Sequence, residues 1–506
     1  MKRGTLLRIL LVLLGSALLF EGGVRLLLFS NLTADFSIAQ RLRKPRLFAH
    51  ANVEDLFWLL HREFFDGPVV TPPDYHPRLG WVGSLVSPRD LRHVHENEIG
   101  DRRPVLLYGD SFSRCMTLEG ACFEDLMQAD ELGRTHCLLN YGVVGYGLDQ
   151  TATMVELTQD LYADRDPIVV VGVFVDDDLD RCALSFRSSN KPRMDADGVM
   201  QPASPVPSPL PRTVSYGLRL LLHREPLFSS WLHQALCPLR EINRENRLRC
   251  QRVIDYLARV LTGGGHPHFV VLFAGRSSIQ DPGGSGWREA FLCKRLDALG
   301  IPWVTARGPM LAHARAGGRP ITDYYQQDGH LNALGNYAAF RAIRDGMDGR
   351  FGDRDDYAFT PSELAGPPLT PDRIDAIDLG GERAAAKYEL NDRPPFVHRD
   401  EFSRLAFRVA GRRPTEVSYR TAGHSASFEG VARFIPMGRL GPGQGSVRLT
   451  LLGDGETLFQ AVVKRGDPDL PVRVDLAGVQ AFTVRVDSAG DGKRGDWMML
   501  ASPLFH

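Results

Sequence analysis

The stretch VLLYGDSFS, Val105 to Ser113, is an apolar run that ends in a Gly-Asp-Ser turn. The run Val105–Tyr108 predicts a short buried strand, and Gly109 begins the turn. A serine between a strand and a helix lies at the carboxyl edge of a sheet, where backbone N–H groups can stabilise an oxyanion. Ser111 is therefore a candidate nucleophile, although a Gly-Asp-Ser turn that only caps a helix has the same sequence.

Four further apolar runs follow this one, with helical patterns between them. The runs predict strands at Cys137–Asn140, Ile168–Val175, His268–Phe273 and Pro302–Val304, and the clearest helical patterns are Asn246–Leu261 and Trp287–Leu299. Strands that alternate with helices indicate an α/β domain whose parallel sheet is covered on both faces. Binding and catalytic sites in such sheets lie at the carboxyl ends of the strands.

A second polar segment, DGHLNALGN from Asp328 to Asn336, comes late in the same domain. A histidine is the usual base that takes a proton from a serine, and a carboxylate fixes its tautomer. His330 and Asp328 are therefore candidates for these two roles. The alternative is an exposed loop before a helix that begins near Asn332.

Together and in this order, the two segments resemble those of the SGNH/GDSL hydrolase family. The intermediate segments extend the resemblance: NYGVVGYG, Asn140 to Gly147, lies where the family has an Asn-x-Gly-x-x-Gly block, and Asp176–Asp178 lies where it has Gly-x-Asn-Asp. The resemblance covers roughly residues 100–350. It implies a flavodoxin-like three-layer domain, a Ser111–His330–Asp328 triad, and an oxyanion hole formed by Ser111, Gly145 and the third-block residue.

The chain departs from the family's pattern in the third block. Asp176, the expected match, or Asp177 if the register shifts by one, stands where the family has an asparagine that donates to the oxyanion. An ionised aspartate cannot donate, and loss of one oxyanion donor typically costs about 10²–10³ in rate. Three alternatives follow: a protonated Asp176, another donor, or a site with two backbone donors. Arg181 is positioned in sequence to pair with one of these aspartates.

The amino terminus predicts a membrane anchor. Lys2, Arg3 and Arg8 precede an uncharged run, Ile9–Phe20, which Glu21 interrupts before apolar residues resume. The run is short for a full span of roughly 20 residues, but snorkelling charged residues can extend it. We expect an uncleaved signal anchor at 1–30 with a cytoplasmic amino terminus, which leaves the rest of the chain periplasmic. A cleaved signal peptide and a buried helix are the alternatives.

Composition shifts divide the rest of the chain. We expect a lead-in segment at 31–99, the α/β domain at 100–350 with a proline-rich exposed insertion at 185–212, a linker at 351–395 and a final domain at 396–506. The final domain contains short strand-like runs separated by Gly/Asp/Pro turns, which predicts a β-sandwich. These runs are Ser446–Leu452, Thr457–Val463, Val472–Leu476 and Phe482–Val486.

The final domain resembles the NPCBM-type, galactose-binding-like modules found on proteins that act on glycans. The resemblance rests on YRTAGHSASFEG (Tyr419 to Gly430), GSVRLTLLGDGETLFQA (Gly445 to Ala461) and VRVDLAGVQAFTVRVDSAGDG (Val472 to Gly492). It implies an all-β jelly-roll sandwich and a glycan ligand. Asp454-Gly455 predicts a hairpin turn rather than a contact. Trp497 is either a core residue or a platform on which a sugar stacks, and Tyr146 either lines a sugar site or packs.

Composition excludes some partners. The chain has 506 residues with 60 basic and 61 acidic side chains, and no basic run, so no nucleic-acid partner is expected. Seven cysteines include no CxxC pair, and we expect neither a metal site nor a cofactor.

These features predict a serine esterase that acts on an acylated polysaccharide or other glycan. A transferase that takes acyl groups from an integral-membrane donor is the first alternative, and a non-catalytic glycan-binding protein is the second.

Overall fold

The computed structural model describes most of the chain. The described residues are 3–33, 36–50, 53–66, 75–116, 122–187, 189–195, 197–205, 208–211, 214–223, 239–326, 329–364, 375–377, 396–399, 405–408, 415–420, 427–435, 446–464, 466–487, 489 and 497–505.

A five-stranded parallel sheet forms the centre of the first large domain, in the order β4-β3-β5-β8-β9. Its strands are β3 (Arg103–Gly109), β4 (His136–Gly142), β5 (Ile168–Phe174), β8 (His268–Phe273) and β9 (Trp303–Thr305). Counted along the chain this is the order 2-1-3-4-5, the flavodoxin-like arrangement. The predicted α/β class and all five predicted strands are confirmed.

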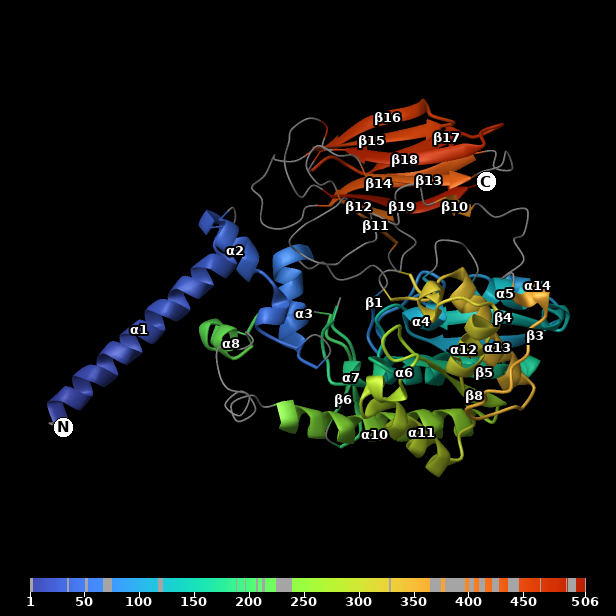
Figure 1. Cartoon of the computed structure of the whole chain (residues 1–506), viewed down its shortest axis with the longest axis horizontal. Coiled ribbons are helices and arrows are strands. Elements are labelled where there is room, and N and C mark those ends of the chain that lie inside the picture. Colours follow the sequence, from blue (N-terminus) through green and yellow to red (C-terminus); the bar gives the residue numbers. More distant parts are fainter. Residues whose placement is uncertain are drawn as a thin grey trace.

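Helices cover both faces of this sheet. On one face lie α5 (Phe123–Ala129), α12 (Arg307–Ala316) and α13 (Ala333–Met347), and on the other lie α6 (Leu148–Thr158), α10 (Leu239–Gly264) and α11 (Arg288–Leu299). The three layers are visible in Figure 1. The helix predicted near Asn332 begins there because the Asn332 side chain caps α13 by accepting a hydrogen bond from the backbone N–H of Gly335 at 2.9 Å.

The strand order reverses between β3 and β5, and the crevice outside the carboxyl ends of such strands is where ligands bind in open α/β sheets. Short helices begin at this edge: α4 (Ser111–Arg114) follows β3, and α7 (Asp178–Arg181) follows β5. The candidate residues of the first and third blocks therefore meet at the place where the topology favours a site.

Residues before β3 contribute to the core of this domain. After β1 (Tyr75–His76) and β2 (Gly80–Trp81), Leu79, Trp81 and Ile99 are buried in the same apolar cluster as the central strands. The second half of the lead-in segment thus packs against the central sheet.

The expectation that the proline-rich stretch 185–212 is exposed is wrong for much of it. Phe186 and Met194 are buried, and Lys191 is buried with both side-chain oxygens of Asp149 at 2.7 and 2.8 Å from its Nζ. This ion pair ties the stretch to α6. The prolines interrupt helices and strands, but burial is decided by the packing and ion pairing of the residues between them. The stretch contains the two-stranded ribbon β6 (Arg193–Met194) and β7 (Met200–Gln201).

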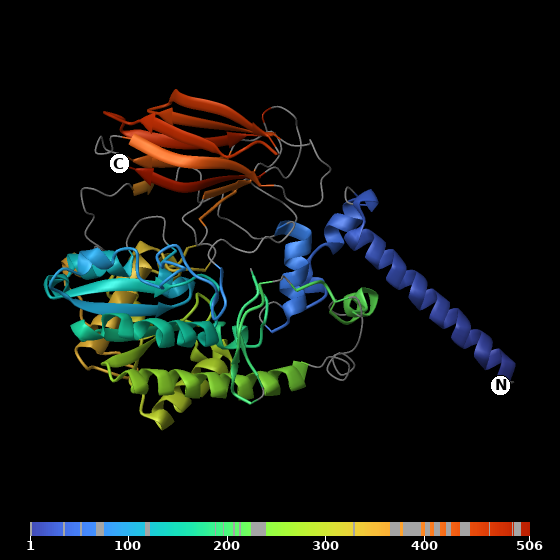
Figure 2. The same cartoon turned by 180° about the vertical axis from the view of Figure 1, so that it is seen from behind.

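The C-terminal part forms two five-stranded antiparallel sheets. One has the order β10-β13-β18-β15-β16 and the other β11-β12-β19-β14-β17. The strands are β10 (Asp375–Ile377), β11 (Phe396–Arg399), β12 (Leu405–Arg408), β13 (Thr415–Arg420), β14 (Ser427–Ile435), β15 (Ser446–Gly453), β16 (Glu456–Lys464), β17 (Leu470–Asp475), β18 (Ala481–Asp487) and β19 (Trp497–Phe505). Apolar residues of both sheets, among them Phe428, Leu449 and Phe482, form one core. The predicted sandwich is confirmed, and it stands apart from the α/β layers in both views (Figure 1, Figure 2).

The amino terminus is a single helix, α1 (Arg3–Phe29), which projects away from the rest of the molecule (Figure 1). Its stretch Leu11–Phe29 is long and apolar enough to cross a membrane. Smaller helices follow it: η1 (Asn31–Thr33), α2 (Ser37–Leu42), η2 (Pro45–Leu47), α3 (Asp55–His61) and η3 (Arg62–Asp66), with α8 (Tyr216–His223) beside them. The remaining short elements are η4 (Glu96–Ile99), η5 (Glu131–Arg134), η6 (Gln159–Arg165), η7 (Pro282–Ser285), η8 (Ile321–Tyr324) and α14 (Pro361–Leu364).

Candidate active site

Ser111 and His330, which are 219 residues apart in sequence, meet at the carboxyl edge of the sheet. The Nε2 atom of His330 lies 2.8 Å from the Oγ atom of Ser111, and the distance from this Oγ to Oδ2 of Asp110 is 3.3 Å. An imidazole nitrogen at this distance is within reach of the hydroxyl proton. The arrangement can therefore convert Ser111 into a nucleophile.

The turn that carries Ser111 requires Gly109. Its φ of +147° is a backbone conformation that favours glycine, and an added Cβ atom would lie 2.1 Å from Oγ of Ser113. Asp110 then caps α4, because its Oδ1 accepts a hydrogen bond from the backbone N–H of Phe112 at 2.8 Å. The helix-cap interpretation of Gly-Asp-Ser is thus correct for Asp110, and it leaves the Ser111 hydroxyl directed at His330.

Several contacts hold the loop that bears His330. The backbone N–H of Gln326 donates to the His330 carbonyl at 2.7 Å. The side-chain amide of Gln326 donates to the carbonyl of Met116, just beyond α4, at 2.8 Å. The ring of Phe112 packs on the imidazole at a centroid distance of 5.5 Å and stacks on Phe174 at 4.1 Å. The loop and the nucleophile helix are therefore fixed to each other. Asp328, the predicted partner of His330, lies outside the described residues.

A buried guanidinium links the first block to the third. Arg181 donates to Oδ2 of Asp110 and Oδ1 of Asp178, each at 2.8 Å, and lies 2.6 Å from Oδ2 of Asp177. The predicted pairing of Arg181 with an aspartate of the third block is confirmed, and it extends to the residue beside Ser111. Burial, followed by the nearby Asp110 carboxylate, raises the pKa of Asp178 well above its ordinary value. Arg181 therefore offsets the charge of a carboxylate cluster directly behind the nucleophile.

The structure separates the two third-block candidates. Oδ2 of Asp176 accepts hydrogen bonds from the Ser278 hydroxyl at 2.6 Å and the Gly275 backbone N–H at 2.9 Å, beyond the end of β8. Within the described residues Asp176 makes no hydrogen bond to Ser111. Asp177 instead shares Arg181 with Asp110. The contacts therefore place Asp177, the residue of the shifted register, beside the Asp110–Arg181 pair, and Asp176 at the end of β8.

The second block forms a tight turn next to α4. Asn140 donates from its side chain to the Ser113 carbonyl and to Oε2 of Glu124, both at 2.9 Å, and accepts from the Gly142 backbone N–H at 3.0 Å. Gly145 has φ +86°, and a Cβ atom there would lie 2.5 Å from Nη1 of Arg187. The predicted oxyanion residue thus lies beneath a guanidinium group.

Arg187 is a feature that the sequence analysis missed. Its guanidinium carbon lies 4.9 Å from the ring centre of Trp58, so it is stacked between that ring and the Gly145 turn. Both contacts join segments that are distant in sequence, and nothing in the local sequence around Arg187 indicated them.

The remaining predicted residues have structural environments of their own. Tyr146 is completely buried at 0 % exposure, donates its hydroxyl hydrogen bond to the Trp81 carbonyl, and has its ring centre 5.6 Å from that of Trp81. It packs rather than lining an open sugar site. Trp497 begins β19, and its side chain lies outside the described residues. Asp454 accepts hydrogen bonds from the backbone N–H groups of Gln480 and Ala481, as a turn residue would.

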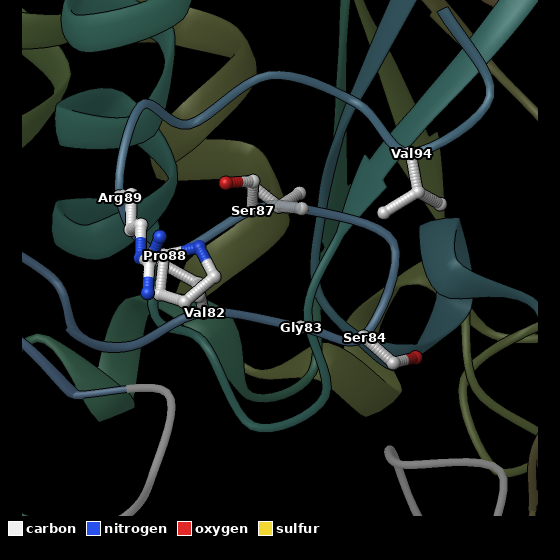
Figure 3. A pocket seen from close by; sticks show the side chains of 8 residues that line it. Val82, Gly83, Ser84, Ser87, Pro88, Arg89 and Val94 are labelled. Carbon is white, nitrogen blue, oxygen red and sulfur yellow. The ribbon is translucent and has the colours of Figure 1, made fainter.

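A hollow of about 480 Å³ lies in the loop after β2, next to the second block. It is lined by Val82, Gly83, Ser84, Val86, Ser87, Pro88, Arg89 and Val94. Figure 3 shows Arg89 and Pro88 on one side of it and Val94 on the other. An added Cβ on Gly83 would lie 3.3 Å from the Val143 side chain, so this loop packs against the turn that carries Gly145.

Comparisons with known proteins give likenesses to two kinds of molecule. Most of the chain is similar to the crystal structure of a two-domain esterase (CEX) active on acetylated mannans, with 9 % identity, a TM-score of 0.30, and coverage of 84 % of this chain and 97 % of that one. A catalytic mutant of Axe2, an acetylxylan esterase from Geobacillus stearothermophilus, gives 12 % identity, a TM-score of 0.28, and coverage of 48 % and 94 %.

A smaller part of the chain is similar to the structure of the CBM51-2, in complex with GlcNAc, and INT domains of Clostridium perfringens ZmpB. The identity is 20 %, the TM-score 0.18, and the match covers 20 % of this chain and 21 % of that one. No curated protein matches the chain. One protein family does match part of it, over residues 412–506. The chain thus ends in an NPCBM/NEW2 domain.

Proposed function

We propose that this protein is an extracytoplasmic serine esterase of the SGNH type that removes ester-linked acyl groups, O-acetyl in particular, from a glycan. The observation that carries the proposal is the 2.8 Å contact between His330 Nε2 and Ser111 Oγ at the switch point of a 2-1-3-4-5 sheet. A base, a hydroxyl nucleophile and backbone N–H groups at a strand-to-helix turn are the parts that acyl transfer requires.

In the proposed reaction, Nε2 of His330 takes the hydroxyl proton of Ser111 as Oγ attacks the ester carbonyl carbon. The carbonyl oxygen becomes an oxyanion beside the N–H groups of Ser111 and Gly145. Collapse of this intermediate breaks the bond to the sugar oxygen, which receives the proton from His330 and leaves an acyl-serine. Water then attacks the acyl-serine by the same steps. Asp328 would hold the His330 tautomer.

The third block determines how the oxyanion is stabilised. Asp177 lies against Arg181, and an ionised carboxylate has no proton to donate, so we assign the oxyanion to the two backbone donors. The Arg187 guanidinium over the Gly145 turn adds positive charge on the same side. In this proposal the two backbone N–H groups and the positive charge of Arg187 together take the place of the family's asparagine amide.

The sandwich supplies the glycan part of the proposal. The NPCBM/NEW2 match and the resemblance to glycan-associated modules support a role in holding the enzyme on its polymeric substrate. Trp497 remains the candidate stacking residue. The hollow along the loop 82–94 beside the Gly145 turn is the candidate path for the glycan chain, with Arg89 at its edge.

For location we propose that α1 is a single-pass anchor with the catalytic part in the periplasm. The basic residues Lys2, Arg3 and Arg8 before the apolar run favour a cytoplasmic amino terminus. A bilayer anchor beside the catalytic domain also supports the alternative function, an O-acyltransferase. In that case an acyl group from an integral-membrane donor forms the acyl-Ser111, and a sugar hydroxyl replaces water as the attacking group.

The test measures p-nitrophenyl acetate turnover and acetate release from an acetylated polysaccharide, using the full chain in detergent. Ser111→Ala should reduce both rates by about 10³-fold or more. Ser113→Ala is the matched control, because it removes a buried hydroxyl from the same helix whose Oγ has no hydrogen-bond partner within the described residues. We expect it to retain activity.

Three outcomes separate the candidates. Ser111-dependent release of acetate from both substrates supports the esterase. An acyl adduct on Ser111 that turns over only when a glycan acceptor is added indicates the transferase. Absence of both turnover and adduct contradicts the catalytic proposal and leaves a glycan-binding protein.

A further inference from the structure

The anchor helix α1 changes character at Glu21. From Leu11 to Phe20 every side chain is exposed except the half-buried Gly15 position, and eight of these ten residues are large and apolar or alanine. From Glu21 onward one face of the helix is covered: Val24 is 4 % exposed and Leu28 is 2 % exposed. A helix that is apolar and exposed on all sides is satisfied only by lipid or by another protein core.

Glu21 binds the amino-terminal end of α8. Its carboxylate accepts three hydrogen bonds, from the Ser215 hydroxyl at 2.9 Å, the Tyr216 backbone N–H at 3.1 Å and the Gly217 backbone N–H at 2.7 Å. These donors lie almost 200 residues away along the chain. A charge that interrupts the apolar run in the sequence therefore has a specific partner in the folded protein.

Arg25, one turn later, reinforces the same contact. It donates to Oε1 of Glu21 at 2.7 Å and to the Val214 carbonyl at 2.6 Å, and its guanidinium carbon lies 5.0 Å from the centre of the Tyr216 ring. Both charged residues of this helix segment thus bind the segment that begins α8.

An apolar cluster completes this contact between α1 and the folded body, which we call the joint. It contains Val24, Leu28, Phe48, Ala49, Leu56, Leu60, Tyr216 and Leu220, which come from α1, α3, α8 and the segment that follows η2. Arg43 adds a hydrogen bond to the Ser30 carbonyl at 3.0 Å. The carboxyl-terminal third of α1 is therefore part of the folded body. The rest of the helix projects away from the described elements (Figure 1), up to Phe20, whose ring lies beside Gly217 of α8.

We propose that the bilayer covers α1 only from Arg3 to Phe20, and that Glu21 to Phe29 is docked on the protein as a rigid stem. The inference rests on the membrane anchoring proposed above and adds where the membrane ends. The 18 residues from Arg3 to Phe20 span about 27 Å at 1.5 Å per residue, close to the roughly 30 Å of a hydrocarbon core. The uncharged run Ile9–Phe20 forms the apolar part of this stretch, and the long side chains of Arg3 and Arg8 reach the cytoplasmic interface by snorkelling.

Two consequences follow for the enzyme. The helix is retained, because cleavage near its carboxyl end would remove Glu21, Val24 and Leu28 from a joint that they help to form. The catalytic domain is held at a fixed height and orientation on the membrane rather than on a loose tether, with α8 at the lipid surface. The glycan, or an acyl donor in the membrane, must then approach the Ser111 edge within that geometry.

The first experiment maps the boundary with single cysteine substitutions in the full chain, in membrane fragments open to reagent on both faces. Positions Leu13, Leu18, Leu26 and Leu32 suit this, because they are all well exposed on the protein itself, at 61, 64, 52 and 85 %. A charged, membrane-impermeant maleimide should label the Leu26→Cys and Leu32→Cys variants but not the Leu13→Cys and Leu18→Cys variants. All four should react once the membrane is dissolved in detergent, and labelling of the unmodified chain is subtracted.

The outcomes distinguish this inference from the proposed anchoring. Protection of Leu26→Cys equal to that of Leu18→Cys would place Leu11–Phe29 in lipid and overturn the docked stem, with the anchor intact. Labelling of all four variants before detergent, or a mature protein that lacks these residues by mass, would overturn the anchoring itself.

The second experiment tests the joint. The thiol of a Leu28→Cys variant, at a buried position, should be protected in the otherwise unmodified chain. Adding Glu21→Ala should increase its labelling rate several-fold, because α8 loses the carboxylate that binds it. Adding Leu18→Ala instead is the matched control in the same helix, and it should leave the rate unchanged. Equal labelling of Leu28→Cys with and without Glu21 would contradict the role of this residue.

Discussion

The α/β domain and the C-terminal sandwich bury very different side chains. The α/β domain buries charged residues in its interior, including Asp110, Asp149, Asp178, Arg181 and Lys191. In the described part of the sandwich, Thr450 is the single polar residue that is buried, and the rest of the core is apolar. Burial of a charge is costly unless it is paired. The difference supports the proposal that the charges behind Ser111 serve the reaction and that the sandwich acts through its surface.

The largest effect is expected at Arg181. Arg181→Met leaves the carboxylates of Asp110, Asp177 and Asp178 without their shared cation, and breaking a buried pair costs about 3–5 kcal/mol in the free energy of unfolding. Urea unfolding measures this loss, and ester turnover of the folded fraction should fall as well, because Asp110 positions the Ser111 turn.

The matched control for this prediction is Arg307→Met. Arg307 is buried and paired with Glu289, but this pair joins α12 and α11 and has no contact with Asp110. It should lower stability on the same scale and leave turnover per folded molecule intact. Equal loss of turnover in both variants would contradict a specific role for the cluster behind Ser111.

The second effect concerns the sandwich. Leu449 of β15 is completely buried in its core, and Leu449→Ala should destabilise this domain by about 2–5 kcal/mol. Turnover of a small ester should not change, because no charged cluster or catalytic candidate lies in the described part of the sandwich core. Leu458→Ala, on the exposed surface of β16, is the control that should alter neither property. A parallel loss of small-ester turnover would show that the two regions are not independent.

The sequence predicted the elements better than their contacts. The strand His268–Phe273 and the helix start at Asn332 follow from apolar periodicity and capping, which are local properties. The stretch 185–212 was predicted to be exposed because it is rich in proline, yet Lys191 within it is buried against Asp149, 42 residues away. The choice between Asp176 and Asp177 likewise depends on Ser278 and Arg181, and no local pattern determines which side chain faces which partner.

The pH dependence of the α/β domain gives a third, smaller effect. Burial, with the nearby His95 as a lesser cause, lowers the pKa of His93 to about 3. In the unfolded chain this pKa is about 6.5, so below pH 6.5 the unfolded state takes up a proton that the folded state does not. His93 therefore does not lower the free energy of unfolding above pH 6.5. The free energy of unfolding falls progressively as the pH drops toward 3, and the loss is about 2 kcal/mol at pH 5.

The variant His93→Gln tests this expectation. It keeps a donor for the Asn140 carbonyl, which lies 3.2 Å from Nε2 of His93, but it cannot be protonated. Urea unfolding at pH 7.5 and pH 5.0 should show a smaller difference between the two pH values for the variant than for the unmodified protein. The sandwich, whose buried core holds no titratable group within the described residues, should lose less stability over this range. An unchanged difference in the variant would exclude His93 as the cause.

The smallest effect is expected at Asp454, where the sandwich does use a carboxylate, but on its surface. Asp454 has φ +49°, and its side chain accepts hydrogen bonds from the backbone N–H groups of Gln480 and Ala481 at 2.8 to 3.1 Å. Asp454→Ala removes these bonds and should cost about 1 kcal/mol in sandwich stability. Asp454→Asn keeps an oxygen acceptor and tolerates positive φ, so it should recover most of the loss. Calorimetry gives both values, and binding to the acetylated polysaccharide should be the same in all three proteins if Asp454 is a turn residue. A selective loss of binding in a stable variant would instead make it a glycan contact, and would place function on the turn that joins β15 to β16.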